Sequence, residues 1–383
     1  MLSRILFPVT EETFFREYWT KKFLHISGPA EKFSGLYNWE TLNRALEEHQ
    51  FTPDRLVLFK NGKPIPAASY MNERQVNSNR FVNELTNGAT LILNACDEFY
   101  PPLREFCVFL EQLTHVRVQT NLYAGWREDH GFNVHWDTQD VLILQIYGRK
   151  HWKVWNPTRL YPFRSDVVDT SEKTIPKEAP IWEGVLEPGA MLNIPRGWWH
   201  IATPMDEPCL HLTVTVCNLN GINFLGWFRE KKLKSKESAR MELPVIATVA
   251  EQRMWLADLK KDIDELWSET LLDEFMAEKD AEAIARPVLS LPGDADRRSA
   301  GIQLDTPVKL ALARPLHFAY GNETATFAAN GSEWEVKQSV AEKLRKFNDF
   351  LPHTIKELSP EPDFRVVTIV MALVRSEVLR RLT

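Results

Sequence analysis

The 383-residue chain contains no run of 18 or more apolar residues, and the apolar stretch at its start is too short for a secretory signal. Cysteine is also scarce: Cys96, Cys107, Cys209 and Cys217 stand in apolar segments without a C-x-x-C spacing. This pattern is typical of reduced, buried cysteines rather than of disulfides or zinc ligands. These absences argue against a membrane-spanning or disulfide-stabilised secreted protein, and they predict a cytoplasmic location.

An excess of positive charge is missing as well. The chain has 46 Lys and Arg against 52 Asp and Glu, a net charge of −6, which argues against bulk binding to nucleic acid or anionic membranes. One basic run, residues 228–236, could contact nucleic acid, but a solvated helical face is the interpretation we favour. The chain also has no G-x-S-x-G motif or Cys/His signature, so no side-chain nucleophile is predicted.

The pattern of apolar and turn residues predicts several domains, since 44.4 kDa is too large for one ordinary core. Helices are expected at 10–24, 39–48 and 102–113, and Asn61-Gly62 predicts a hairpin turn. Short strands at close spacing between about 115 and 217 indicate a β-sandwich or barrel. After Asn218 a helical block spans 222–285, a polar linker covers 292–301, and residues 306–383 form a small α+β domain.

Three residues in the strand region have the chemistry of metal ligands. His135 and Asp137 stand two apart, so on an extended strand both side chains reach the same face. His200 follows a Pro-Arg-Gly turn on a later strand that the barrel could bring alongside. Two histidines and a carboxylate form the facial set that leaves positions open on non-haem iron(II). The alternative is a surface turn residue at 135 and a hydrogen-bonded core histidine at 200.

Lys150 follows a Gly148-Arg149 dipeptide at the end of an apolar strand. If that dipeptide makes a two-residue hairpin turn, Lys150 lies opposite Tyr147 and points to the same wall as the metal ligands. A buried lysine requires an anion, and the distal carboxylate of a dicarboxylic cosubstrate would supply one. If the turn is longer, Lys150 points to water; the spacing does not decide between the two.

Residues 209–217 alternate cleanly, with His211, Thr213 and Thr215 on one face. That polar face could line a ligand-holding barrel or lie in water, the second being the commoner arrangement. Asn121 and Tyr123 form a similar pair on one face of the strand before the loop that leads to His135.

Several motifs together resemble the JmjC-type, cupin-like 2-oxoglutarate oxygenases, and within them the ribosomal oxygenase subgroup. The resemblance covers about 115–217 and rests on Asn121-Leu122-Tyr123, His135-x-Asp137, Gln145-x-Tyr147-Gly148-Arg149-Lys150-x-Trp152, Glu187-Pro188-Gly189, Ile194-Pro195-Arg196-Gly197 and His200. It implies a mainly β core, a double-stranded β-helix (jelly roll) in residues 1–217, with α+β additions. These additions are a helical dimerisation region at 218–291 and a winged-helix-like domain at 302–383.

The same resemblance implies the chemistry of the site. Fe(II) would be held by His135, Asp137 and His200, and the metal centre would be the whole of the catalytic machinery. Lys150 and Tyr123 would contact the distal carboxylate of 2-oxoglutarate, Asn121 would line the pocket, and Thr213 or His211 would assist. With O₂, such an enzyme hydroxylates a protein side chain, ribosomal proteins being the subgroup's substrates, and releases succinate and CO₂. A homodimer without direct nucleic-acid binding is expected.

One segment departs from the family pattern. The loop before the first ligand is usually small and uncharged in the family, whereas residues 124–132 here are charged and aromatic. The resemblance therefore supports the expected metal and cosubstrate more strongly than it supports any particular substrate. Two other readings are a non-catalytic cupin that regulates a partner through its winged helix, and an enzyme acting on a peptide or small molecule. A binding module has no use for a cation aimed at a dicarboxylate, and small-molecule cupin enzymes usually hold metal with more histidines.

Overall fold

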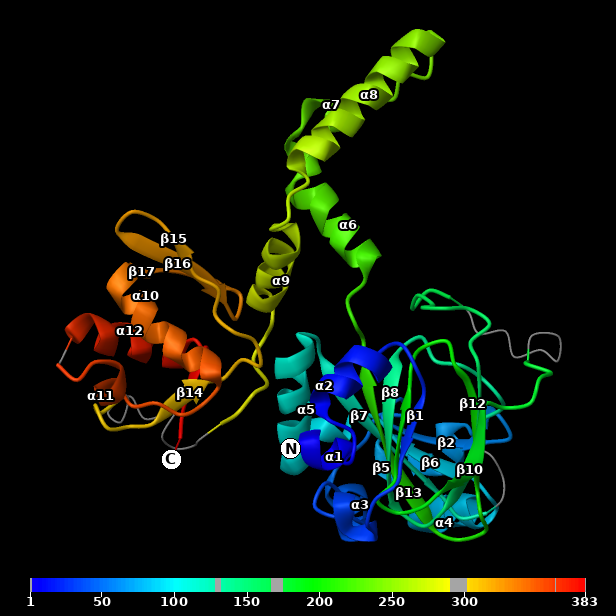
Figure 1. The fold of residues 1–383 in the computed structure, drawn as a ribbon. Helices are drawn as coiled ribbons and strands as arrows, with labels where there is room; N and C mark the ends of the chain where they lie inside the picture. The colour runs from blue at the N-terminus through cyan, green and yellow to red at the C-terminus, as the bar shows by residue number, and fades with distance from the viewer. Residues whose placement is uncertain (1, 128–131, 167–174, 290–301, 362, 383) are drawn as a thin grey trace. The chain divides into compact units, whose positions relative to one another are not determined.

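The computed structural model describes residues 2–127, 132–166, 175–289, 302–361 and 363–382 (Figure 1). The chain forms two compact units. One contains residues up to 110 together with 116–218, and the other contains 111–115 together with the chain from 219 onward.

Two antiparallel sheets form the core of the first unit. In the larger sheet the strands lie in the order β1 (Leu24–Ile26), β11 (Met191–Ile194), β8 (Asp140–Tyr147), β13 (Cys209–Val216), β7 (Val118–Gly125), β6 (Thr90–Leu93), β2 (Leu56–Lys60) and β3 (Lys63–Pro64). The smaller sheet has the order β10 (Trp182–Leu186), β9 (Lys150–Trp155) and β12 (Trp199–Pro204). Inward apolar side chains of both sheets pack together at one end of the barrel, among them Val141, Val154 and Leu192. The β-rich core expected from the sequence is confirmed.

The helices of this unit are α1 (Leu2–Leu6), α2 (Glu11–Thr13), α3 (Trp39–Glu48), α4 (Ser78–Thr86) and α5 (Pro101–Thr114), and β4 (Met71–Asn72) pairs with β5 (Gln75–Val76). Cys107 on α5 contacts Thr120 of β7, so α5 covers the outer face of the larger sheet. The predicted helix at 39–48 is confirmed residue for residue, capped by the Asn38 side chain. The helix predicted at 10–24 begins as expected at its Thr10 cap but ends in a π-helical turn at Tyr18, because residues 24–26 pair with β11 instead.

The hairpin at Asn61-Gly62 is confirmed as the β2–β3 turn. At Gly148-Arg149, where the sequence left two alternatives open, no two-residue hairpin forms. Strand β8 pairs with β13 and β11, while β9 pairs with β10 and β12 in the other sheet. The chain therefore crosses between the sheets at Gly148. There φ is +60°, and a Cβ would stand 2.1 Å from the carbonyl oxygen of Pro208.

Gly148→Ala is expected to destabilise the fold by at least about 2 kcal/mol. The left-handed conformation costs an L side chain about 1–2 kcal/mol, and the carbonyl of Pro208 cannot yield without moving β13. The matched control is Gly226→Ala in a helix, where a Cβ meets nothing within 4 Å and about 0.5–1 kcal/mol of stabilisation is expected. Urea unfolding followed by circular dichroism compares the two, and a Gly148→Ala curve that overlays the wild type would refute the crossing-point account.

The cysteine prediction needs one correction. All four cysteines are free thiols, and Cys96, Cys107 and Cys209 are buried as expected, but Cys217 is exposed. Strand β13 ends at Val216, so Cys217 lies just beyond the last residue that the sheet covers.

The second unit begins with the helices α6 (Gly221–Lys231), α7 (Glu237–Arg240), α8 (Val249–Leu266) and α9 (Leu271–Ala281). Its α+β part contains β14 (Val308–Leu310), β15 (Ala319–Tyr320), β16 (Thr324–Ala329), β17 (Ser332–Lys337), α10 (Gln338–Leu344), α11 (Ile355–Leu358), α12 (Phe364–Arg375) and β18 (Leu379–Arg381). One apolar core including Phe347, Val366 and Leu373 holds this part together. The predicted linker at 292–301 lies outside the described residues.

The basic run at 228–236 is neutralised by acidic partners. Its ion pairs are Arg229–Glu230, Lys231–Glu278, Lys232–Glu274, Lys234–Glu230, and Lys236 with both Asp262 and Glu265. This pairing supports the interpretation as a solvated helical face. In the described part of the chain, no helix combines the length and apolar character needed to span a membrane.

Candidate metal centre and its pocket

A single antiparallel backbone bridge brings the two predicted histidines together. The amide of His135 donates to the carbonyl of His200 at 3.1 Å, and the amide of His200 donates back at 2.7 Å. Asp137 lies two residues farther along, and its carbonyl accepts from the amide of Gly197 at 2.9 Å. The turn before β12 therefore fixes the segment that carries the H-x-D pair.

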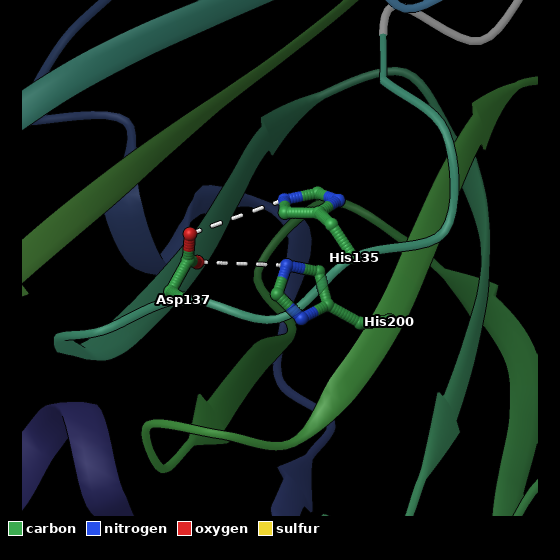
Figure 2. Close-up of side chains that lie close together, drawn as sticks. All are labelled: His135, Asp137 and His200. Carbon is green, nitrogen blue, oxygen red and sulfur yellow. Dashed lines mark ion pairs between the residues drawn. The ribbon is translucent and has the colours of Figure 1, made fainter. Parts of the chain in front are cut away.

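The two ring nitrogens of each histidine have different partners. Nδ1 of His135 lies 2.8 Å from the carbonyl oxygen of Asn133, and Nδ1 of His200 lies 3.0 Å from that of Trp198. Each Nε2 then faces the carboxylate of Asp137, at 3.9 Å from His135 and 3.6 Å from His200 (Figure 2). A backbone carbonyl that binds Nδ1–H orients the ring and leaves Nε2 free as a ligand.

The electrostatics of the cluster suit a cation. His200 is 5% exposed, and burial, reinforced by the neighbouring His135, lowers its pKa to about 4. The imidazole of His200 is therefore neutral at physiological pH and keeps a lone pair on Nε2. One donor atom each from His135, Asp137 and His200 lie within 4.8 Å of one another, the one such group of three among the described residues. The mixed nitrogen and oxygen donor set fits a divalent iron-type ion.

The cluster borders a cavity of about 190 Å³ inside the barrel. Its lining residues come from both sheets and the loop before His135: Thr90, Tyr123, Phe132, His135, Asp137, Ile143, Lys150, Trp152, His200, Ala202, Pro204, His211 and Thr213. The polar face of β13 thus lines the interior rather than lying in water, because His211 and Thr213 are buried against the facing sheet. A cavity of this volume holds a small molecule, not a folded segment of chain.

Lys150 is the cation of this cavity. It is 3% exposed, and its burial lowers its pKa. No carboxylate of the described chain pairs with it. Of the two orientations that the sequence left open, the structure has Lys150 pointing inward, although no hairpin places it there: Lys150 begins β9, whose alternate residues His151 and Lys153 point outward to Glu183. A buried ammonium without an anion is costly, so the cavity is built for an anionic ligand.

Tyr123 and His211 stack in parallel on neighbouring strands, with ring centroids 5.0 Å apart. Burial, together with the charge of Asp137, raises the pKa of Tyr123, so its hydroxyl stays protonated and can donate. Burial, together with the charge of Lys150, lowers the pKa of His211, which is therefore neutral. Nδ1 of His211 is buried and makes no hydrogen bond within the described chain.

Asn121 departs from its expected place. It shares the inner face of β7 with Tyr123 but is not among the residues that line the cavity. Its amide oxygen instead accepts from the amide of Ala95 and from Nε2 of Gln119, both at 2.9 Å. A side-chain hydrogen bond with Asn121 lowers the pKa of the Tyr123 hydroxyl and so offsets part of the rise that burial causes. Asn121 thus adjoins Tyr123 rather than the cavity, because the neighbouring loop already occupies its amide.

Six lining residues had no assigned role in the sequence, among them Trp152, Thr90 and Phe132. Trp152 is 3% exposed, and its indole N–H has no acceptor in the described chain, a signal visible only once β9 is placed. Thr90 belongs to β6, which lies outside the sequence motifs that carry the family resemblance. Phe132 lies in the loop that departs from the family pattern, and it contacts the rings of Tyr123, His135 and Phe59.

Comparison with known proteins identifies the domain that carries this site. The JmjC domain family matches residues 98–224. The Drosophila pseudoobscura pseudoobscura bifunctional lysine-specific demethylase and histidyl-hydroxylase NO66 is 28% identical over 228 residues, which cover 56% of this chain and 22% of that protein. The Bacillus subtilis protein YxbC is 30% identical over 240 residues, covering 56% of this chain and 70% of YxbC. The chain thus spans less than a quarter of the length of its Drosophila relative.

Solved structures share the fold over nearly the whole chain. The ribosomal oxygenase YcfD of Escherichia coli superposes with a TM-score of 0.60 at 17% identity, covering 98% of each chain. A complex of YcfD with cobalt and 2-oxoglutarate gives the same TM-score and identity, covering 98% of this chain and 99% of that one. At this identity the likeness concerns the fold. The matched domain and the Bacillus relative lead to one conclusion: this protein belongs to the JmjC domain family.

Proposed function

We propose that this protein is a 2-oxoglutarate-dependent dioxygenase that hydroxylates an amino-acid side chain of a protein substrate, with release of succinate and CO₂. One observation carries the proposal: two imidazole Nε2 atoms and a carboxylate converge beside a cavity that also contains a buried lysine without an anion. The first feature suits a metal, and the second suits a dicarboxylate. An enzyme that binds both a metal and a dicarboxylate cosubstrate needs both in one cavity.

In this proposal His135, Asp137 and His200 hold Fe(II). The residues fit the ion, because their donor atoms cluster within 4.8 Å and both imidazoles are oriented by backbone carbonyls. When bound, the iron supplies the activation of O₂ that couples decarboxylation of 2-oxoglutarate to hydroxylation of the substrate. The chain contributes no side-chain nucleophile.

Lys150 binds the distal carboxylate of 2-oxoglutarate. The registers of β9 and β12 support this, since Pro204 lies opposite Lys150 while His200 lies opposite Val154, farther along the same pair of strands. The protonated hydroxyl of Tyr123 and the hydroxyl of Thr213 donate to the same carboxylate, and His211 supports the ring of Tyr123. Asn121 acts through Tyr123 by orienting its hydroxyl.

The substrate is a protein, and a ribosomal protein is the first candidate. The Drosophila relative is named a histidyl-hydroxylase and the E. coli neighbour a ribosomal oxygenase, and both names describe action on proteins or ribosomes. Mass spectrometry of ribosomal proteins, before and after incubation with the enzyme, Fe(II), ascorbate and 2-oxoglutarate, tests this. Gain of one oxygen atom on a defined residue is expected. Succinate formation without any modified protein would redirect the search to peptides or small molecules.

A non-catalytic regulatory cupin is the second candidate, and it is disfavoured by Lys150. A binding module would gain nothing from a buried, unpaired ammonium, which costs free energy in the absence of a ligand. The ion-paired state of the basic run at 228–236 also weakens any nucleic-acid role.

We further propose that the protein is a cytoplasmic homodimer built through residues 218–291, with residues 302–383 as a winged-helix-like domain that supports the dimer or the substrate. No residue of α8 is buried, and the segment around its start is apolar and open to solvent. Val245, Ile246, Met254 and Leu256 are all more than half exposed. Exposed apolar area of this kind marks an interface.

Sedimentation equilibrium at micromolar concentration is therefore expected to give about twice 44.4 kDa. Ile246→Lys combined with Met254→Lys should yield a folded monomer, because both side chains are exposed in the single chain. Leu351→Lys combined with Phe364→Lys changes two apolar residues of the α+β part that are also more than half exposed, and this variant should stay dimeric. A wild-type monomer, or a dimer that survives the first double change, would overturn this assembly.

A further inference from the structure

A second cavity, larger than the metal pocket, lies on the outer face of the larger sheet in the first unit. Its volume is about 910 Å³. The residues that line it, called here the α3–α4 trench, are Trp39, Leu42, Asn43, Leu46, Glu47, Glu48, His49, Gln50, Gln75, Val76, Ser78, Phe81, Val82, Leu85, Thr86, Leu91, Trp126, Arg127, Asp206 and Pro208. Leu91 lines the trench while the preceding Thr90 lines the metal pocket, so β6 separates the two cavities.

One end of the trench is aromatic. Trp39 begins α3, and Trp126 directly follows β7, with the ring centroids 5.7 Å apart. Both indoles are half-buried, so each keeps part of its surface for a ligand. Tryptophan faces attract Lys and Arg side chains through the ring quadrupole while packing their apolar stems.

The other end of the trench is acidic. Glu47 and Glu48 close α3, where the helix dipole adds negative potential. Glu47 has no ion pair within the described chain, and Glu48 has only an exposed contact with Arg44 at 3.9 Å. The one arginine of the trench, Arg127, is paired with Asp206 at 3.3 Å. The trench therefore has a net negative charge.

Between these ends the floor is apolar. Leu42, Phe81 and Leu91 are buried there, while Val82 at the rim is 57% exposed. From Trp39 to Glu48 the helix advances about 13 Å, which an extended chain of about four residues would span. The aromatic end, apolar floor and acidic end thus match a short extended peptide with basic and apolar side chains.

We propose that the α3–α4 trench binds a short basic and apolar segment of the protein substrate, remote from the residue that is hydroxylated. The inference rests on the proposed function only in taking the occupant to be the substrate. The trench is linked to the active site through the chain itself, since Trp126 lies three residues beyond Tyr123 of the metal pocket. An acidic trench repels nucleic acid and anionic lipid, which leaves a basic polypeptide as the fitting macromolecule.

Fluorescence anisotropy with the full chain tests this proposal. The probe is a fluorescein-labelled ten-residue peptide that alternates Arg and Leu, and two comparison peptides replace Arg by Glu or by Ser. We expect binding of the Arg peptide alone. Glu47→Gln combined with Glu48→Gln should weaken it about two- to thirtyfold, given about 0.2–1 kcal/mol for each exposed charge pair. Val82→Lys should weaken it as well, because it places a cation on the apolar rim.

The matched control is Glu40→Gln combined with Glu84→Gln, which removes the same amount of charge from α3 and α4, at positions that do not line the trench, and should leave binding unchanged. The His135→Ala, Asp137→Ala variant should also bind the peptide fully, because the trench lies across β6 from the metal site. Equal binding of the Ser peptide, or equal loss in the control, would overturn the proposal. Succinate formation by the wild type reports separately on the oxygenase function, so either idea can fail alone.

Discussion

Replacing His135 and Asp137 together by alanine is expected to abolish 2-oxoglutarate-dependent succinate formation. The double change leaves His200 as the sole protein ligand of a three-ligand site. Loss of a mere outer-shell partner costs about 10–100-fold in metal affinity or activity, so loss of two ligands should exceed about a hundredfold. The fold should persist, because the side chains of both residues are partly exposed, at 26% and 35%.

The control for this variant is a histidine–carboxylate pair elsewhere on the same barrel. Nε2 of His151 lies 3.2 Å from the carboxylate of Glu183 on the outward face of the smaller sheet. His151→Ala combined with Glu183→Ala also removes one imidazole and one carboxylate, and it should leave succinate formation near wild type. Wild-type turnover by the His135, Asp137 double variant would show that the metal is held elsewhere.

Lys150→Ala should raise the dissociation constant for 2-oxoglutarate by about one to two orders of magnitude. A charge-assisted hydrogen bond to a carboxylate in a closed cavity contributes about 1.5–3 kcal/mol, and each 1.4 kcal/mol is tenfold in affinity. Lys150 is 3% exposed and has no competing carboxylate in the described chain, so little of that energy is lost to water. Calorimetry without O₂, with Mn(II) in place of iron, measures binding without turnover.

Lys153→Ala is the matched control for Lys150. It stands on the same strand, but its side chain is 39% exposed and pairs with Glu183 at 3.0 Å. Its removal should leave 2-oxoglutarate affinity unchanged. If Lys150→Ala also binds with wild-type affinity, the anchoring cation must be another residue, with Arg149 beside it the next to test, although Arg149 is already paired with Glu207.

The spacing of chemical groups along single strands was predictable from the sequence. The spacing of two placed His135 and Asp137 beside one cavity, although neither belongs to a strand: His135 forms an isolated bridge to His200, and Asp137 follows in the loop before β8. The alternation in β13 places His211 and Thr213 together. The capped helix α3 was also predictable, since its Asn38 cap and apolar spacing act within ten residues. In each case the interactions that fix the structure are local in the chain.

Pairings between distant segments were not predictable. Lys150 points inward because β9 pairs with β10 and β12, each separated from it by an intervening loop, and not because it closes a hairpin with β8. Another long-range pairing, between β1 and β11, placed Leu24 in a strand, although the sequence predicted it as the last residue of a helix. Asn121 was misplaced because its amide is taken by Ala95, a residue outside every motif. In each case the interacting segment lies far away in the sequence, so the spacing of nearby residues does not specify it.

The central claim is that one cavity holds both the iron and the cosubstrate, and anomalous diffraction tests it most directly. Crystals grown without O₂ in the presence of Fe(II) and 2-oxoglutarate would be measured at the iron absorption edge. We predict one strong peak bounded by Nε2 of His135, Nε2 of His200 and the carboxylate of Asp137, with the distal carboxylate of 2-oxoglutarate on Nζ of Lys150. An iron peak away from these three residues, or a cosubstrate that leaves Lys150 without an anion, would contradict the account.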